Sequence, residues 1–321
     1  NSGTVNINGK TNITTDKVAF DVCKYASYAV PTVNVNTTGI IKGAIEVTPE
    51  INNNLNISGG YFTAPIQEAW CAEGYIPTTT TVDGVTYNTV KEGKYVAQIG
   101  TTKYETFAAA LAAVQDGEII ELFDVEGNEN TEINFDRKIA FTIKGNAPKY
   151  ALPVVTFTNA KVNIEGSTIL IPELDARQNA TINVISSTVY DAGGNSIVKS
   201  YYNGAINIDA NSTVYTMQVT TMGYITVKGT LNATWQTNVY GNGLITLNNG
   251  AKFNTAALQL TGQDYNGRDN TDANRVGEPA EIIVNGGAKF VVGSVKSSSG
   301  ADYSYNSSKG INIGTIAGKS A

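Results

Sequence analysis

Val162-Asn163-Ile164 is the first of seven short segments in which two apolar residues flank a middle residue that is polar in six of them. The other segments are Ile182-Asn183-Val184, Ile206-Asn207-Ile208, Ile225-Thr226-Val227, Ile245-Thr246-Leu247, Ile282-Ile283-Val284 and Ile311-Asn312-Ile313. Subtracting the first positions 162, 182, 206, 225, 245, 282 and 311 gives spacings of 20, 24, 19, 20, 37 and 29 residues. Period-2 alternation that returns at such intervals predicts a stacked β-solenoid with one such strand per coil.

The alternation also predicts how the coils stack. Successive side chains of a strand point to opposite faces, so the two apolar residues of a segment face inward and the middle residue faces outward. One coil cannot bury its apolar face alone, whereas stacked coils bury it and pair their backbone groups. The L-x-x-L-x-L spacing of leucine-rich repeats is absent. The chain is therefore expected to be an all-β solenoid.

Similar residues follow several of the segments and predict a turn and a second strand in each coil. Asn249-Gly250-Ala251-Lys252-Phe253 matches Gly286-Gly287-Ala288-Lys289-Phe290, and asparagine and glycine suit a sharp corner. Four aromatic residues of these second strands are expected at matching positions: Tyr190, Tyr215, Phe253 and Phe290. We interpret them as an aromatic stack that lines the coils, not as a ligand platform.

The same segment type occurs near the N-terminus, at Val5-Asn6-Ile7, Val33-Asn34-Val35 and Leu55-Asn56-Ile57. Two solenoid segments are therefore expected. Residues 1–80 are interpreted as the C-terminal part of a first β-helix module with its end cap, and residues 118–321 as a second module. The middle asparagines, such as Asn56, are expected to form an outward row.

Residues 81–117 are expected to hold a hairpin or linker and a capping helix. Within this region and just before it, residues 65–74 predict a short helical turn, residues 77–81 a threonine-rich linker, and residues 82–103 hairpin strands.

The capping helix is predicted to begin at about Lys103 or Phe107 and to end at Gln115. Phe107, Leu111 and Val114 form an apolar stripe at helical spacing among alanines. An open solenoid end exposes apolar side chains and unpaired backbone groups, so we expect this short amphipathic helix to cover the end of the second module.

The helix termini carry their own signals. Thr102 and Glu105 have the spacing of a capping box, and Gly117 is suited to the residue that follows a helix.

The junction between the modules resembles a known family. Its segments are Asn56-Ile57-Ser58-Gly59-Gly60-Tyr61-Phe62, Ala72-Glu73-Gly74-Tyr75, Val96-Ala97-Gln98-Ile99-Gly100, Tyr104-Glu105-Thr106-Phe107 and Asp116-Gly117-Glu118-Ile119. They are similar to the module junctions of large gut-bacterial cell-surface proteins with tandem β-helix modules, over roughly residues 55–122. The resemblance implies right-handed parallel β-helices of the pectin-lyase-like fold and display at the cell surface, and it implies no activity.

Composition restricts the class of protein. A net charge of −6 and a pI near 4.9 argue against nucleic acid as a partner, because phosphates would be repelled. No apolar stretch reaches the roughly eighteen residues of a membrane span. The chain opens at Asn1 without a signal segment, which favours a mature or excised piece of a secreted protein. Cys23 and Cys71 could form one disulfide or remain two free buried thiols.

The chemistry of the chain is not evident from any one motif. Without histidine, Ser-His-Asp and Cys-His nucleophile systems and His-ligated metals are excluded. Glu165 and Asp209 are expected in one column two coils apart, near the separation of an inverting glycosidase pair. Lys228 should lie beside Asp209, which favours a solvated charge pair.

Two acidic groups could hold calcium. Glu173, Asp175 and Arg177 with Asp191 have the residue types of a lyase site, against a plain polar corner. The acidic run from residue 116 to residue 136 could bind a metal or form a solvated edge, and we favour the edge.

The strongest candidates for ligand binding lie in loops. The 37-residue interval requires residues 262–279 to leave the coil, and this segment contains Asp264, Tyr265, Asp269 and Asp272. Calcium binding by these acids is one alternative, and a floppy loop without metal is the other. Exposed tyrosines can stack on sugars, and Tyr201, Tyr202 and Tyr265 are the candidates for this role.

Three functions remain open. The first is a structural or adhesive segment of an extracellular, surface-anchored bacterial protein, which extends binding regions and contacts glycans, a host surface or neighbouring modules of its own polypeptide. The second is a lyase or glycosidase that cleaves polysaccharide, and the third is a calcium-stabilised glycan-binding module that uses residues 262–279.

Overall fold

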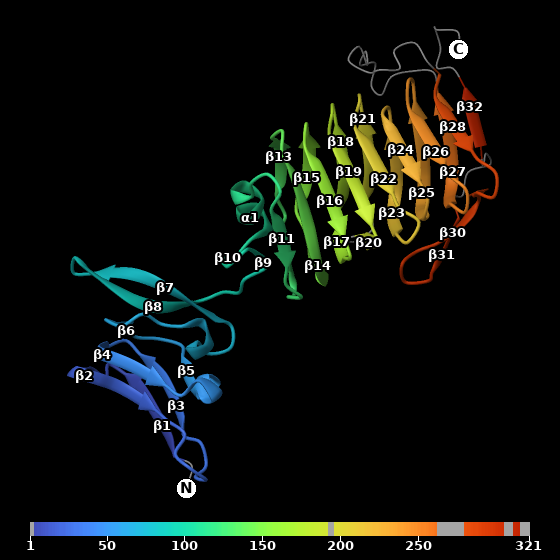
Figure 1. The fold of residues 1–321 in the computed structure, drawn as a ribbon. Helices are drawn as coiled ribbons and strands as arrows, with labels where there is room; N and C mark the ends of the chain where they lie inside the picture. The colour runs from blue at the N-terminus through green and yellow to red at the C-terminus, as the bar shows by residue number, and fades with distance from the viewer. Residues whose placement is uncertain (1–2, 192–195, 262–278, 305–310, 315–321) are drawn as a thin grey trace. The chain divides into compact units, whose positions relative to one another are not determined.

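The computed structural model describes residues 3–191, 196–261, 279–304 and 311–314 (Figure 1). About 60% of the residues are in strands and 6% in helices, and the strands form a parallel β-solenoid of about 11 coils. The chain divides into two compact units, Asn1–Lys94 and Tyr95–Ala321. The predicted fold class, two β-helix segments with a short helix capping the second, is confirmed.

The first unit consists of two small sheets. One sheet is parallel and has the order β1 (Thr4–Gly9), β3 (Thr32–Thr37), β5 (Leu55–Ile57). The other has the order β2 (Ile13–Val22), β4 (Ile40–Val47), β6 (Tyr61–Phe62), β8 (Val85–Glu92), β7 (Tyr75–Val82). Two 3-10 turns follow β4 and β6, η1 (Pro49–Asn54) and η2 (Glu68–Trp70), and η2 confirms the predicted helical turn.

The outward asparagine row exists in this unit. Asn34 Nδ2 donates to Asn6 Oδ1 at 2.8 Å, and Asn56 Nδ2 donates to Asn34 Oδ1 at 3.0 Å. The inward neighbours Val35, Leu55 and Ile57 are fully buried. The middle residues of the segments thus link the coils from outside while the apolar residues link them from inside.

The threonine-rich linker predicted at residues 77–81 is wrong. These residues belong to β7, which pairs antiparallel with β8 from Tyr75↔Glu92 to Val82↔Val85. Asp83 and Gly84 connect the strands with φ of 49° and 79°, as a two-residue hairpin turn requires. β-branched threonines favour strands, so the run extends the sheet instead of separating the units.

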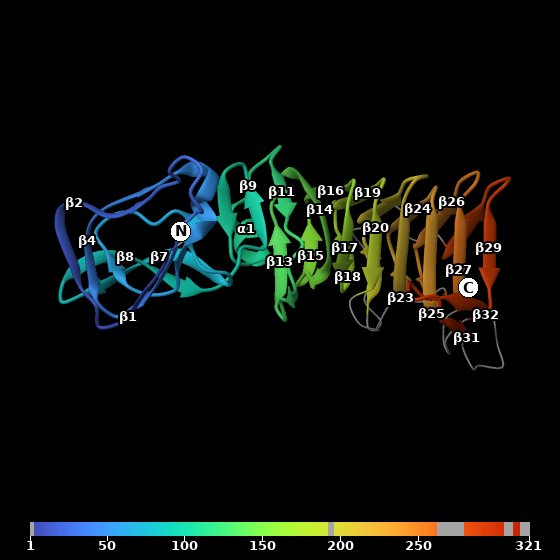
Figure 2. The same cartoon turned by 90° about the horizontal axis from the view of Figure 1, so that it is seen from below.

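The second unit winds through three strand faces in each coil (Figures 1 and 2). The first face contains β11 (Ile119–Leu122), β14 (Ala140–Ala151), β16 (Lys161–Glu165), β19 (Thr181–Ile185), β22 (Ala205–Ile208), β24 (Tyr224–Val227), β26 (Leu244–Leu247) and β28 (Glu281–Val284). The second face contains the end of β14 with β12 (Gly127–Asn128), β17 (Thr168–Ile171), β20 (Thr188–Asp191), β23 (Thr213–Thr221), β25 (Thr230–Tyr240), β27 (Lys252–Thr261) and β29 (Lys289–Val292). The third face contains β13 (Glu132–Asp136), β15 (Val154–Thr158), β18 (Glu173–Arg177), β21 (Ile197–Tyr201), the second halves of β23, β25 and β27, and β32 (Ile311–Gly314).

Six of the seven segments that predicted the solenoid stack in register on the first face. Val162 pairs with Ile182, Ile182 with Ile206, and the series continues through Ile225 and Ile245 to Ile282. The side chains of this column are buried from Val162 to Ile245. Its outward neighbours form a second asparagine ladder, in which Asn183 donates to Asn163 and Asn207 to Asn183, each at 2.9 Å.

The seventh segment lies on another face. Ile311 pairs with Leu258 of β27, not with Ile282, so β32 belongs to the third face. The chain leaves the coil after Gly293 and forms a hairpin of β30 (Ser294–Lys296) and β31 (Asp302–Ser304) before it returns. A constant alternation does not reveal which face a strand joins once an insertion has interrupted the coil.

The predicted four-membered aromatic column is also wrong. Val214, not Tyr215, pairs with Leu231, and Leu231 pairs with Phe253. Phe253 therefore faces inward and stacks on Phe290, with ring centroids 5.2 Å apart. Tyr215 faces outward and stacks on Tyr190 at 5.7 Å. A shift of one residue in register moves a side chain to the opposite face of a sheet.

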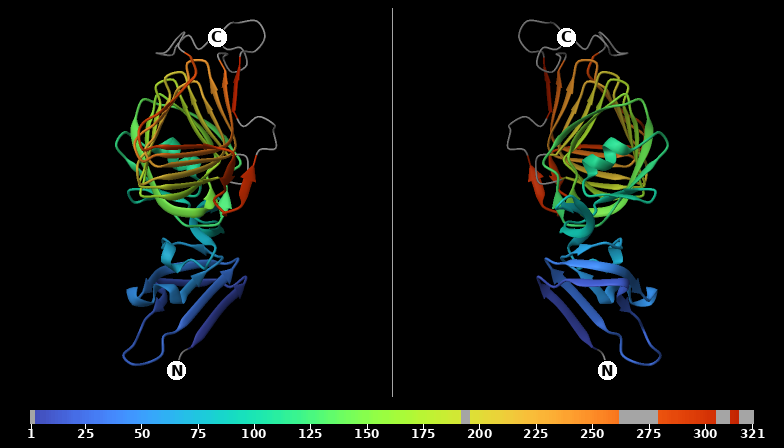
Figure 3. Two further views of the ribbon diagram at one scale, coloured as in Figure 1. Left: turned by 90° about the vertical axis from the view of Figure 1, so that its right-hand side faces the viewer. Right: turned by 90° about the vertical axis from the view of Figure 1, so that its left-hand side faces the viewer.

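The capping helix α1 (Phe107–Ala113) follows a short hairpin of β9 (Ala97–Ile99) and β10 (Thr102–Tyr104) and lies across the end of the second unit (right panel of Figure 3). Phe107, Leu111 and Val114 are buried in the core of the coils, as the apolar stripe predicts. The predicted capping box is wrong, because Thr102 is in a strand and Thr106 is the N-cap, whose Oγ1 accepts from Ala109 N at 3.1 Å.

A carboxylate from the coil below holds the start of this helix. Glu129 accepts hydrogen bonds from the backbone N–H groups of Phe107 and Ala108 and from the Tyr150 hydroxyl at 2.7 Å. Burial and this hydrogen bond raise the pKa of Tyr150 well above its ordinary value. Three donors thus converge on one carboxylate and fasten the cap.

Other acids of the run from residue 116 to residue 136 also bond to the protein. Asp116 Oδ1 accepts from Ala140 N and Glu118 Oε2 from Gln115 N, both at 2.7 Å. Among the described residues, no group of three acids, cysteines or histidines could hold a metal ion. These acids join the cap to the first coils instead of only solvating an edge.

Cys23 and Cys71 are free thiols, so the disulfide alternative is excluded in this structure. The expectation of two buried thiols is also incorrect in part, since Cys23 is exposed and Cys71 is half-buried. Burial, with the nearby charge of Glu68 as a smaller cause, raises the pKa of Cys71 from 9.0 to about 11.

Replacement of Glu129 should loosen the cap. Glu129→Ala leaves two backbone donors and the buried Tyr150 hydroxyl without their acceptor, so we expect a loss of about 1–3 kcal/mol in the free energy of unfolding. Hydrogen exchange measured by mass spectrometry should show faster exchange over residues 106–114. Glu132→Ala, on an exposed position, is the control and should cost less than about 0.5 kcal/mol. Equal exchange in both variants would contradict the role of Glu129.

The two thiols should react at different rates. The thiolate is the reactive form, and the raised pKa of Cys71 keeps this thiol protonated up to about pH 11. Iodoacetamide at pH 8 should therefore label Cys23 more than about tenfold faster than Cys71, as followed by peptide mass spectrometry. Labelling in 8 M urea is the control, where roughly equal rates are expected. Faster labelling of Cys71 in the folded protein would disprove its protected state.

Candidate functional site

The structure places only two of the six residues predicted to bind a ligand. Tyr201 ends β21, and the guanidinium of Arg177 lies over its ring, 5.3 Å from the centroid. Tyr202 follows in a turn with φ of 59° and is half-buried.

The other four predicted residues, Asp264, Tyr265, Asp269 and Asp272, lie outside the described residues. The calcium and sugar-binding predictions for their loop stay predictions.

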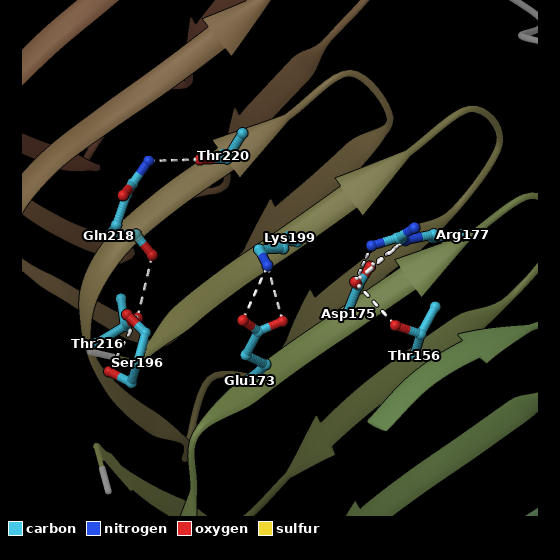
Figure 4. A network of polar contacts seen from close by, with 9 residues as sticks. All are labelled: Thr156, Glu173, Asp175, Arg177, Ser196, Lys199, Thr216, Gln218 and Thr220. Carbon is cyan, nitrogen blue, oxygen red and sulfur yellow. Dashed lines mark hydrogen bonds and ion pairs between the residues drawn. The ribbon is translucent and has the colours of Figure 1, made fainter. Parts of the chain in front are cut away.

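Arg177, which lies over the Tyr201 ring, belongs to a network of polar side chains on the third face (Figure 4). Asp175 is its most buried member, with none of its side chain exposed. Its carboxylate accepts from Arg177 Nε at 3.1 Å, from Arg177 Nη2 at 2.7 Å and from Thr156 Oγ1 at 3.2 Å. Arg177 lies two residues along β18 and folds back over Asp175. The hydrogen bonds to Asp175 are the main cause of a raised pKa of Arg177.

A second ion pair lies beside the first. Lys199 stands opposite Asp175 in the register of β18 and β21, but its Nζ bonds to both oxygens of Glu173 at 2.8 Å (Figure 4). The side chains of Lys199 and Glu173 are only 20% and 17% exposed. Two acids and two bases therefore neutralise one another, and the acid oxygens already have cationic partners.

The predicted lyase constellation is thus an ion-pair network within the sheet. A lyase base must be free to take a proton, and a calcium site needs several uncommitted carboxylates. Glu173 and Asp175 both accept from bases of the protein, and the described residues contain no group that could hold a metal ion. These contacts indicate that the network stabilises the third face, and they do not favour a role in acid-base chemistry.

The network continues along the third face as amides and hydroxyls. Gln218 Nε2 donates to Thr220 Oγ1 at 2.9 Å, and on the next coil Gln236 Nε2 donates to Asn238 Oδ1 at 3.1 Å. Deeper in the bend between the faces, Thr216 Oγ1 donates to the carbonyl of Ser196 at 3.0 Å. Asn238 Nδ2 is buried and has no hydrogen-bond partner among the described residues. The polar side chains of this face thus form these hydrogen bonds within their own strand or to an adjacent strand.

The two acids of the predicted glycosidase pair contact other groups of the protein. Glu165 lies near Lys144, with 3.8 Å between Oε1 and Nζ. Asp209 Oδ1 accepts from Ser186 N and Asn211 N at 3.1 Å and from the Ser212 hydroxyl. Asp209 therefore stabilises a corner of the coil, and its oxygen is not directed to a substrate on the outer face.

A polar hollow lies elsewhere, under the hairpin of β30 and β31. This hairpin packs on the outer side of β25 and β27 and borders an open hollow of about 420 Å³. The coil contributes Tyr215, Asn232 and Asn254 to its lining, and the hairpin contributes residues 294–298 and 300.

The sequence contained a signal for this hollow. The register Tyr215↔Asn232↔Asn254 places an aromatic residue and two amides in one outward column. Our alignment placed Tyr215 with inward phenylalanines, and the insertion at residues 293–310 was not recognised, so the site was missed.

No known protein family matches the chain, and no curated protein or solved structure shows a significant match to it. The fold itself, a parallel β-solenoid of about 11 coils, therefore stands on the structure alone. Among the described residues, no helix has the length and apolar character needed to cross a membrane.

The Asp175–Arg177 pair should show strong energetic coupling. Arg177→Ala leaves a buried carboxylate without its cation, which costs about 3–5 kcal/mol, whereas in Asp175→Ala the partly exposed Arg177 can turn to water. We expect a coupling of about 1–3 kcal/mol in the double-mutant cycle. Urea unfolding is followed by the fluorescence of Trp235 in a Trp70→Phe background, so that only the second unit reports.

The exposed pair Lys144–Glu165, in the same unit, is the matched control. Its side chains are 41% and 45% exposed, so its coupling should be about 0–1 kcal/mol. A coupling for Asp175–Arg177 no larger than that of the control would contradict a stabilising network.

Proposed function

We propose that this chain is a structural and adhesive segment of a surface protein, which extends binding regions and itself carries no catalytic site on its coils. The observation that supports this role best is the state of its acidic residues. Glu129, Asp175, Glu173 and Asp209, the acids nearest to any constellation, are each bound to backbone, hydroxyl or cationic groups of the protein.

The stacked coils also suit a mechanical, spacing role. Every coil of a solenoid bonds to the next through strands that run across the stack, so a chain of this kind needs no globular core to maintain its form. The asparagine ladders and the buried aliphatic columns repeat the same contact from coil to coil. Residues of such a structure contribute mainly to stability, and ligand specificity is left to insertions.

The setting of this segment is part of the proposal. The junction motifs resemble those of gut-bacterial surface proteins with tandem pectin-lyase-like modules, and on that resemblance the segment is extracellular, displayed at the bacterial surface and joined to neighbouring modules. Its partners would be glycans or a host surface. The acidic charge of −6 disfavours nucleic acid as a partner.

A substrate assay separates this role from its alternatives. The full chain is incubated with pectin, alginate and mixed plant and mucin glycans, with and without EDTA, and reducing ends and unsaturated uronates are measured. We expect no product, because the acids discussed above are committed to the fold. Product that disappears in Glu173→Gln would replace the proposal by the enzyme alternative.

The same samples test the calcium alternative. The urea midpoint of the second unit is measured in 5 mM EDTA and in 5 mM CaCl₂, and this calcium concentration is about five- to fiftyfold above the dissociation constants of extracellular calcium-binding modules. For a segment stabilised by its coils alone, the two midpoints should agree. A midpoint that rises with calcium would favour the calcium-stabilised glycan-binding module.

A further inference from the structure

An insertion covers one part of the outer surface of the second face and creates a polar hollow there. The outward column of this face runs Tyr190, Tyr215, Asn232, Asn254 and Val291, one residue per coil. The chain leaves the coil after Gly293, and Val295, only 2% exposed, holds the hairpin against the column. The volume of this open hollow, about 420 Å³, is within the range of about 300–1,000 Å³ found for small-molecule sites.

The lining suits a ligand that is rich in hydroxyl groups, and it carries one cationic side chain, Lys296, among its neutral polar groups. Asn232 and Asn254 present amides, which both donate and accept, and the hairpin adds the hydroxyls of Ser294, Ser297 and Ser298. No carboxylate lines the hollow, so a divalent cation has no ligand of its preferred kind there.

The two amides are held in place before any ligand arrives. Asn254 Nδ2 donates to Asn232 Oδ1 at 2.8 Å, and Asn232 is 9% exposed beneath the hairpin. Both residues lie in strands whose backbones pair in register, which fixes their spacing to that of adjacent coils. A preorganised pair of amides costs little conformational entropy when it binds vicinal hydroxyls.

Tyr215 supplies the apolar side of the hollow. Its ring stacks on Tyr190 with an interplanar angle of 15°, which fixes its orientation. Asn232 and Asn254 lie on the two coils that follow the coil of Tyr215. Tyr215 therefore borders the hollow on the side opposite to Tyr190. A rigid aromatic ring next to amides matches a pyranose, which has an apolar face of C–H groups and a rim of hydroxyls.

We propose that the hollow under the β30–β31 hairpin binds a saccharide, with Tyr215 as the stacking surface and Asn232 and Asn254 as the hydroxyl-binding pair. The inference rests on the adhesive part of the proposed function and specifies its ligand class. The site lies on an insertion carried by a regular scaffold, as binding residues commonly do.

The test uses the full chain and neutral disaccharides as probes: lactose, maltose, cellobiose, α-mannobiose and N,N′-diacetylchitobiose. Saturation-transfer NMR and calorimetry should detect at least one of them with a Kd of about 0.1–10 mM, the weak range of small ligands in a single open site. Digalacturonic acid is the acidic comparison and should also bind, because Lys296 lines the hollow and no carboxylate does. Binding of none of these saccharides would overturn the proposal.

The variants locate the site. Tyr215→Ala and Asn254→Ala should each weaken binding about tenfold, and Tyr215→Phe, which keeps the ring, should retain it. Asn207→Ala is the matched control and should keep the affinity, because it removes an amide of the same kind from the ladder of the first face, away from the hollow. Circular dichroism confirms folding of every variant.

The outcomes separate this inference from the proposed function. Affinity lost in Tyr215→Ala and kept in Asn207→Ala supports the hollow. Affinity unchanged in Tyr215→Ala places the sugar elsewhere and overturns the inference, while the structural role of the coils stands. Product in the polysaccharide assay would overturn the structural role, while the saccharide site would still be judged by its own variants.

Discussion

Parallel pairing of each coil with the next, in register, is the constraint on which this structure depends. It places Val162, Ile182 and Ile206 above one another, so that their side chains exclude water together. The same register brings Asn163, Asn183 and Asn207 close enough for their amides to bond along the stack. Burial inside and hydrogen bonding outside thus follow from one geometric relation, and neither could form in a single coil.

Stacking in register leaves backbone groups without partners at the ends of the solenoid and at its corners. An end coil has no neighbour, and the second unit meets this with α1, whose start is held by Glu129 from the coil that it covers. At one corner Asp209 accepts from two backbone N–H groups and a hydroxyl. Many acids that might suggest chemistry are therefore used where the coil ends or turns, because backbone donors are unpaired at those places.

The outward positions are where this scaffold can vary without loss of its core. On the third face they carry an ion-pair network around Asp175 and then amides and hydroxyls, which bond within the face. On the second face the outward column passes from Tyr190 and Tyr215 to Asn232 and Asn254, and there the hairpin closes over it. The hollow described above thus lies where an insertion covers an outward column of a regular scaffold.

The sequence by itself determined the solenoid, its two segments, the outward asparagine row and the apolar stripe of the capping helix. Those features depend on the period-2 alternation and on helical spacing, which are local. Only the tertiary structure decided that Ile311 joins the third face, that Tyr215 and Phe253 point in opposite directions, and that Glu129 caps a helix 22 residues before it in the chain. Each of these depends on which residues of neighbouring coils are paired, and a shift of one residue or one insertion changes the pairing without changing the local pattern.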